Sequence, residues 1–207
     1  MVAAKFLRRV KNQDFLTEHH KRALQKAADI QAIIDLHLTP PEEHTDEWQK
    51  QGESHGKRDT VIYYKVDHPS KLTCRIETPI ESSLLVPLLA VFNESDLYET
   101  WMPKWSVPKM GVRQSLKLKE QPGRGAQIQQ VTVDMPFPIN DREVVLDTYA
   151  VDAIEELGLI SWKGTSLEVG AENGLIPPPQ PGITRIDFDC GWVIRKCPEN
   201  HPCLHDQ

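Results

Sequence analysis

The chain opens with apolar residues that recur at helical spacing. Across residues 5–38 they lie three or four positions apart, which favours an amphipathic helix. A threonine and two prolines at 39–41 end this pattern, because proline disfavours helical backbone in the residue before it. We expect residues 1–45 to form an N-terminal helical segment and residues 46–207 to form the main domain.

The next patterned segments have the period of β-strands. Residues 60–66 are rich in β-branched and aromatic side chains, and residues 71–77 alternate between apolar and polar. Residues 67–70 read Asp-His-Pro-Ser, which is turn chemistry. We therefore predict a β-hairpin.

After the hairpin the pattern changes twice. Residues 84–92 and 96–102 read as two short helices. A run of strands follows, and the proline-rich segment 170–182 within it reads as an extended surface loop. The predicted strands span residues 112–120, 126–134, 142–153, 158–166 and 184–195.

Composition narrows the class of protein. The 207 residues are 39% hydrophobic and 26% charged, as in ordinary globular proteins, and the net charge is −6. An acidic chain is poorly suited to general nucleic-acid binding. The basic start of the chain lacks the apolar core of a secretory signal, although a transit peptide within residues 1–15 stays an alternative. With four cysteines, a reduced, cytoplasmic protein is expected.

Two motifs point to a known family. Residues 93–103 read NESDLYETWMP, and residues 135–145 read MPFPINDREVV. In this order, and with these elements between them, they resemble the START domain, the lipid-transfer module related to the steroidogenic acute regulatory protein. The resemblance covers roughly residues 60–195 and is nearest to the phosphatidylcholine-transfer branch.

The resemblance implies an α+β, helix-grip fold. In that fold a curved antiparallel sheet, with an N-terminal helix and two short helices, wraps a long C-terminal helix. Only a short, proline-broken stretch follows Arg195 here. We therefore expect a START-like domain that lacks its last strand and its gripping helix. The implied function is non-catalytic binding, and transfer between membranes, of one lipid or sterol, with no cofactor.

The strand after the second motif predicts which side chains face a cavity. Successive residues alternate between faces, and one face of this strand carries no charge. A carboxylate in a dry cavity is costly, so Glu143 and Asp147 should point away from it. Similar reasoning on the last strand, together with the tryptophan of the first motif, completes the set. The predicted cavity residues are Val144, Leu146, Thr148, Ala150, Ile186, Phe188 and Trp101.

The second motif also contains a predicted gate. By resemblance it is the loop at the cavity mouth, and Met135, Phe137 and Ile139 are apolar where loops are usually polar. Such a loop can dip into a membrane during lipid uptake, which predicts transient membrane contact. The alternative is that the loop folds inward onto the core.

Basic residues of the first helix allow a second kind of lipid contact. Lys21, Arg22 and Lys26 could meet anionic head groups, or they could form a solvated face. Cys197, His201, Cys203 and His205 are competent metal ligands, but their spacing is irregular for zinc, so no metal is expected.

Two other functions remain open at this point. One is a protein-interaction module with a filled core, whose partner is unknown. The other is a cyclase or aromatase on the same fold, which needs an ionisable group inside the hollow. The predicted inward faces carry none, and the nucleophile-elbow, phosphate-loop and zinc-helix motifs of common enzymes are absent from the sequence.

Overall fold

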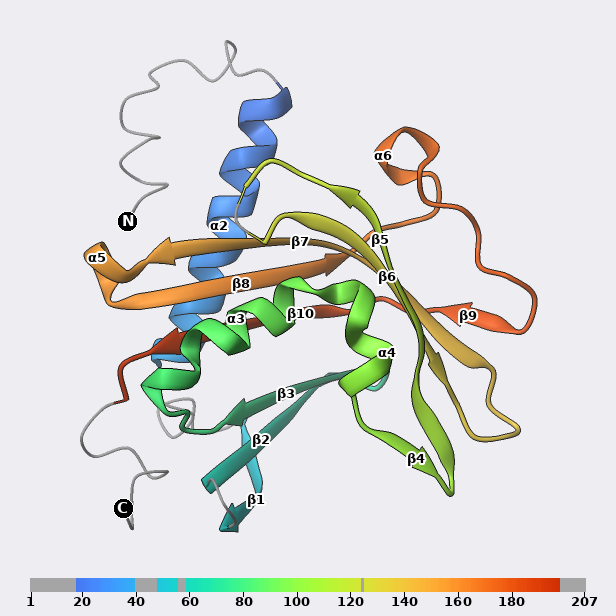
Figure 1. The fold of residues 1–207 in the computed structure, drawn as a ribbon, viewed down its shortest axis with the longest axis horizontal. Coiled ribbons are helices and arrows are strands. Elements are labelled where there is room, and N and C mark those ends of the chain that lie inside the picture. The colour runs from blue at the N-terminus through green and yellow to red at the C-terminus, as the bar shows by residue number, and fades with distance from the viewer. Residues whose placement is uncertain (1–17, 40–47, 56–58, 124, 198–207) are drawn as a thin grey trace.

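The computed structural model describes residues 18–39, 48–55, 59–123 and 125–197 (Figure 1). The first element is the helix α2, Glu18–Leu38. It confirms the C-terminal part of the predicted N-terminal helix, whose earlier residues lie outside the described ranges. None of the helices in these ranges combines the length and apolarity that crossing a bilayer requires.

A small antiparallel sheet follows α2. Its strands β1 (Gln49–His55), β2 (Asp59–His68) and β3 (Lys71–Glu77) pair in sequence order. The predicted hairpin is the pair β2–β3 and is confirmed. Val61 and Tyr63 of β2 form the buried centre of this sheet.

Two helical stretches connect the small sheet to a larger one, as predicted. A 3₁₀ turn at Ser82–Leu84 leads into α3 (Leu85–Asn93), and a second at Ser95–Leu97 leads into α4 (Tyr98–Trp101). The short strand β4 (Lys104–Ser106) follows and begins the large sheet.

The large sheet is antiparallel along its main path, in the order β10-β8-β7-β6-β5-β4. Between residues 109 and 166 its strands agree closely with the predicted ones, whereas β4 was not predicted. Single helical turns interrupt it at α5 (Ile154–Leu157) and α6 (Ala171–Gly174). The remaining strands are β5 (Lys109–Glu120), β6 (Gln127–Asp134), β7 (Asp141–Ala153), β8 (Leu159–Ser166), β9 (Ile183–Arg185) and β10 (Asp189–Arg195).

The prediction of one strand over residues 184–195 is wrong. β9 pairs in parallel with residues 141–143 of β7, whereas β10 pairs antiparallel with β8. The reason is that β8 ends at Ser166, opposite Leu146, and so leaves the first residues of β7 without a neighbour on that side. β9 takes this place, and the chain then crosses to the far side of β8.

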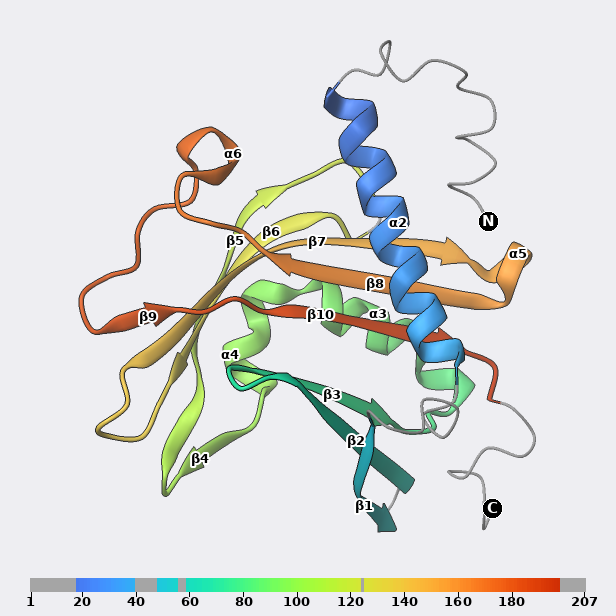
Figure 2. The same ribbon diagram turned by 180° about the vertical axis from the view of Figure 1, so that it is seen from behind.

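The large sheet curls, and helices lie on both of its faces. Figures 1 and 2 show α2 on the outer face of β8 and β10, with α3 and α4 on the inner, concave side. Ile30 and Ile34 of α2 pack against Tyr149 and Leu159 of the outer face. The predicted α+β class and curved antiparallel sheet are confirmed. Within the described residues, which end at Cys197, no helix follows β10.

The segment between β8 and β9 is more than the surface loop that was predicted. Ile176, in its middle, is almost fully buried and packs against Ile128 and Val145 on the outer face of the sheet. The prolines of this segment are turn-forming, but Ile176, just before the first of them, anchors the segment to the sheet. The outer face is therefore covered by α2 and by residues 167–182.

Candidate functional site

The four predicted cavity residues of β7 lie together on the inner face. Val144 packs against the cluster that Tyr98 of α4 forms with Val112 and Val131, which places it on the side of the helices. Leu146, Thr148 and Ala150 share this side by strand alternation. Leu146 and Thr148 are buried, whereas Val144 and Ala150 are partly exposed.

The acidic residues of β7 point to the outer face, but they are not in water. Only 2% of Glu143 and 7% of Asp147 is exposed. Glu143 accepts hydrogen bonds from Gln130 and from Arg185, whose Nε lies 3.0 Å away. Glu143 is therefore neutralised by Arg185, which covers this part of the outer face.

Asp147 is held by the N-terminal helix. Its carboxylate lies 3.0 Å from Arg22 and 2.9 Å from Lys26, and Gln121 donates to it at 3.2 Å. Arg22 also pairs with Glu172 of α6 at 2.7 Å. Arg22 and Lys26 therefore pair with the sheet, although 46% of the Arg22 side chain stays exposed. The two alternatives for the basic residues, lipid contact and a solvated face, stay open.

The inner face contains polar groups that the sequence analysis missed. Gln127 and Gln129 of β6 lie opposite Thr148 and Leu146, so they share the inner face. Both are almost fully buried, and Nε2 of Gln127 donates to Oε1 of Gln129 at 3.3 Å. The signal was present in the sequence, because Gln127 and Gln129 stand at the same alternating positions as the apolar Val131 and Val133.

Tyr98 extends this polar strip to the helices. Its hydroxyl donates to the carbonyl oxygen of Phe92, at the end of α3, over 2.8 Å. Burial raises the pKa of Tyr98 to about 12, although a hydrogen bond with the Gln129 side chain opposes that rise. The phenol therefore stays neutral at physiological pH and acts as a hydrogen-bonding group.

The hydroxyl of Thr148 is already engaged by the backbone. Its Oγ1 lies 3.1 Å from the carbonyl oxygen of Gly125 and 3.0 Å from that of Gln127. In contrast, the hydroxyls of Ser95 and Ser115 are buried and have no hydrogen-bond partner among the described residues. Ser115 lies opposite Val131 and so faces inward. An unsatisfied buried hydroxyl costs about 1–3 kcal/mol.

β5 also brings an ionisable side chain to the inner face. Lys117 lies opposite Gln129 and is partly exposed, with its ammonium 3.4 Å from Glu120. The expectation that the inward side carries no ionisable group holds for residues 144, 146, 148 and 150 of β7. It does not extend to β5, nor to Arg142 and Asp152 near the two ends of β7, which alternate onto the same face.

An aromatic layer fills the β8–β10 part of the inner face. Trp162 and Trp192 are stacked, with ring centroids 6.1 Å apart, and Trp192 stacks on Phe92 of α3 at 5.1 Å. Cys190 lies on the same face of β10 as Trp192, and burial raises the pKa of its thiol to about 12. This thiol is therefore protonated and unreactive at neutral pH.

The remaining predicted cavity residues are less closely grouped. Ile186 and Phe188 lie in the link between β9 and β10, and about half of the Phe188 surface is exposed. Trp101, at the end of α4, is also half-exposed and contacts the ring of Tyr98 edge-on at 5.5 Å. Trp101 thus reaches the β7 strip only through Tyr98.

The predicted gate loop is anchored at its base and exposed at its tip. The Met135 N–H donates to Asp141 over 3.0 Å, and this bond, reinforced by Arg113, lowers the pKa of that carboxyl. Phe137 is 97% exposed, and Ile139 is about half-exposed. The alternative in which the loop folds inward does not apply to Phe137.

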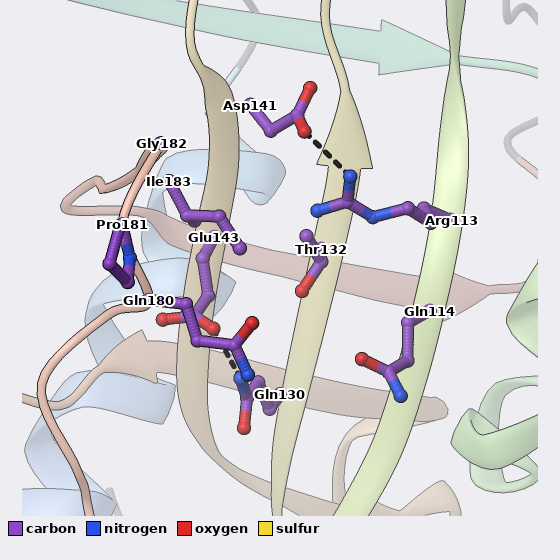
Figure 3. A pocket seen from close by; sticks show the side chains of 10 residues that line it. All are labelled: Arg113, Gln114, Gln130, Thr132, Asp141, Glu143, Gln180, Pro181, Gly182 and Ile183. Carbon is purple, nitrogen blue, oxygen red and sulfur yellow. Dashed lines mark hydrogen bonds and ion pairs between the residues drawn. The ribbon is translucent and has the colours of Figure 1, made fainter.

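The outer face holds a polar pocket of about 350 Å³ (Figure 3). The buried carboxylate of Glu143 and the ion pair of Arg113 with Asp141 lie on its wall. Its surface suits a hydrogen-bonding molecule rather than an acyl chain. Its lining residues are Arg113, Gln114, Gln130, Thr132, Asp141, Glu143, Gln180, Pro181, Gly182 and Ile183.

Metal chemistry finds no support in the described part of the chain. No group of three or more histidine, cysteine or acidic side chains is placed there to hold an ion. Cys197 is a free thiol, and the other members of the C-terminal cluster, His201, Cys203 and His205, lie outside the described residues.

Comparison with solved structures decides the fold. A STAR-related lipid transfer protein from Xanthomonas axonopodis superposes with a TM-score of 0.55 at 19% identity, over 72% of this chain and 73% of the other. The chain has the START fold. The human StarD13 (DLC2) lipid transfer and protein localization domain is also similar, with a TM-score of 0.47 at 17% identity over 88% and 77% of the two chains. Neither a protein-family model nor a curated protein matches the chain by sequence.

The START fold accounts for the two motifs of the sequence. Residues 93–103 form the second 3₁₀ turn and α4, which cover the inner face, and residues 135–145 form the gate loop and the start of β7. The motifs thus lie on the helices over the inner face and at the end of the strand β7.

Proposed function

We propose that this protein binds one lipid or sterol between the inner face of the large sheet and the helices α3 and α4, and passes it between membranes without catalysing a reaction. The uncharged inner strip of β7, within a START fold, is the observation that carries the proposal. The likeness to a STAR-related lipid transfer protein supports the class of ligand.

The driving force is removal of apolar ligand surface from water. Burial contributes roughly 25 cal/mol per Å², so a protein hollow can compete with a bilayer for a single chain or ring system. Val144, Leu146 and Ala150 supply the apolar contacts, and Val144 and Ala150 keep accessible surface that a ligand can cover.

Polar groups of the ligand are recognised by Ser115 of β5 and by Gln127 and Gln129 of β6, rather than by Thr148. The Thr148 hydroxyl is used by the backbone, whereas Ser115 lacks a partner among the described residues. A ligand hydroxyl or ester at this place satisfies Ser115, and the buried amides Gln127 and Gln129 lie on the same face. Specificity then depends on whether the ligand carries a polar group at this depth.

A second candidate is a protein-interaction module with a filled core. The stack of Phe92, Trp192 and Trp162 favours it, because these rings occupy one end of the inner face. Under this alternative no ligand accompanies the folded protein.

Solvent extraction followed by mass spectrometry separates the two candidates. The purified protein should release one lipid or sterol per chain. Val144→Trp places an indole on the inner face and should lower the recovered amount at least roughly fivefold, because the added volume fills ligand space. The control is Thr165→Trp, on the exposed outer face of β8, which should leave recovery unchanged. A folded, ligand-free wild type would support the filled-core module.

A further inference from the structure

Two hairpin turns lie side by side at one end of the large sheet. One joins β4 to β5 at Val107 and Pro108, and the other is the gate loop of residues 135–140. β5 pairs with β6 as far as Gly111 and Asp134, so the turns leave neighbouring strands (Figures 1 and 2).

Ion pairs tie the bases of the two turns together. Lys109, next to the β4–β5 turn, lies 3.0 Å from Asp134 at the start of the gate loop. Arg113 bridges to Asp141 at the end of that loop and to Asp134 at 3.2 Å. The two tips are therefore held as one surface.

The most exposed large apolar side chains of the described residues are at these two tips. Phe137 is 97% exposed and Val107 is 89% exposed, while Trp105 and Ile139 are each about half-exposed. Single exposed apolar residues are ordinary on soluble proteins. Two neighbouring protrusions that both end in apolar side chains indicate an interaction surface.

The charge of this surface differs from that of the whole chain. Residues 104–113 carry three cations and no acid, and residues 134–142 carry one arginine and two acids, which gives a net charge of +2. The complete chain has a net charge of −6. A cationic, apolar tip on an acidic protein complements an anionic membrane surface.

We infer that the β4–β5 turn and the gate loop together form a two-pronged docking surface for an anionic lipid bilayer. Val107 and Phe137 enter the interface, Trp105 sits at head-group depth, and Lys104 meets lipid phosphates. This inference rests on the proposed transfer of lipid between membranes. The sequence predicts membrane contact for the gate loop, and the inference adds the β4–β5 turn as a second anchor.

The arrangement favours a bilayer over a protein partner. The two prongs project from the end of the sheet as separate turns (Figures 1 and 2). A bilayer interface accepts separate protrusions without a matching shape, because each side chain partitions on its own. Each prong should therefore contribute independently to membrane affinity.

Vesicle co-sedimentation tests the inference, with phosphatidylcholine vesicles that do or do not contain phosphatidylserine. Phe137→Ser should weaken partitioning to serine-containing vesicles roughly tenfold and Val107→Ser roughly threefold, since each loses a buried apolar group. The double variant should lose about the product of the two effects. Val66→Ser is the matched control, because Val66 is 65% exposed on β2 of the small sheet.

A second measurement uses the native tryptophan beside Val107. Brominated phospholipids should quench part of the protein fluorescence, and this part should disappear in Trp105→Phe. Equal vesicle affinity of Val107→Ser, Val66→Ser and wild type would overturn the inference, as would quenching that Trp105→Phe leaves unchanged. Vesicle affinity that does not change with phosphatidylserine content or with salt concentration would also overturn the inference.

The outcome is separable from that of the proposed function. If Val107→Ser retains its extracted lipid but loses vesicle affinity, both the cavity and the docking surface are supported. If wild-type protein yields no lipid yet binds vesicles through Val107, the proposed function fails and the docking surface stands. If lipid is recovered and the Val107→Ser variant docks like wild type, only the docking inference fails.

Discussion

The two faces of β7 are both covered, but by different parts of the chain and with different chemistry. On the outer face, Glu143 and Asp147 are buried under α2 and the residue 167–185 segment, and each has a cationic partner. On the inner face, the alternate residues 144, 146, 148 and 150 carry no charge and lie on the side of the helices α3 and α4. Alternation along one strand thus separates a face buried by charged partners from the uncharged face to which we assign the ligand.

An acidic residue on a strand indicates which face points away from the concave side, but it does not indicate that this face is exposed to solvent. Glu143 and Asp147 point away from the concave side, as their desolvation cost requires. They do not mark a wet surface, because distant cations neutralise them in a buried layer. The face that looks polar in sequence is the more tightly closed of the two.

Removal of an outer-face acid should cause the largest loss of stability. Glu143→Ala should lower the free energy of unfolding by about 3–5 kcal/mol, because it leaves the largely buried Arg185 without its carboxylate. Urea unfolding measures the loss. Asp187→Ala, at an exposed position, is the control and should change stability by less than about 0.5 kcal/mol. Equal costs for the two variants would show that the outer layer is not the stabilising one.

Neighbouring valines provide a matched pair for a smaller effect. Val145→Ala should cost about 2 kcal/mol, since Val145 is fully buried against Ile128 and Ile176. Val144→Ala should cost about half as much, because its inner-face site is partly exposed, yet it should weaken lipid retention while Val145→Ala does not. Thermal unfolding and lipid extraction on both variants measure this. A reversed order of effects would contradict the assignment of faces.

A pH titration gives the smallest and most local effect. Burial raises the pKa of Tyr98 to about 12, so its folded form stays protonated at a pH where the unfolded phenol ionises. The stability that this contributes is complete below pH about 10 and is lost as pH rises towards 12. Tyrosinate absorbance of wild type minus Tyr98→Phe should show a step near pH 12. A step near pH 10 would show that the Tyr98 phenol is exposed to water, which would contradict its burial on the inner face.

Local patterns were sufficient for most of the fold. The β2–β3 hairpin, the two short helices and strands β5 to β8 follow from spacing and turn residues that lie within each element. The split between β9 and β10 does not, because alternation continues through residues 184–195 while the pairing partner changes from β7 to β8. Where that change occurs depends on the end of β8, which no local pattern records.

The candidate site was predicted in part for the same reason. The inner strip of β7 follows from alternation within one strand. The pairing of Asp147 with Arg22 spans 125 residues, so it could not be read from either segment alone. Gln127 and Gln129 could have been found, since paired amides on one face of a core strand are unusual enough to question.

Methyl NMR offers the most direct test of the inner face as a ligand surface. Methyl-labelled protein would be titrated with the lipid recovered by extraction, and contacts to acyl or ring protons recorded. Val144 and Leu146 should shift and show contacts to the ligand, whereas Val145, one residue away on the opposite face, should show none. Ligand contacts at Val145 or Ile176, with Val144 unaffected, would contradict the account.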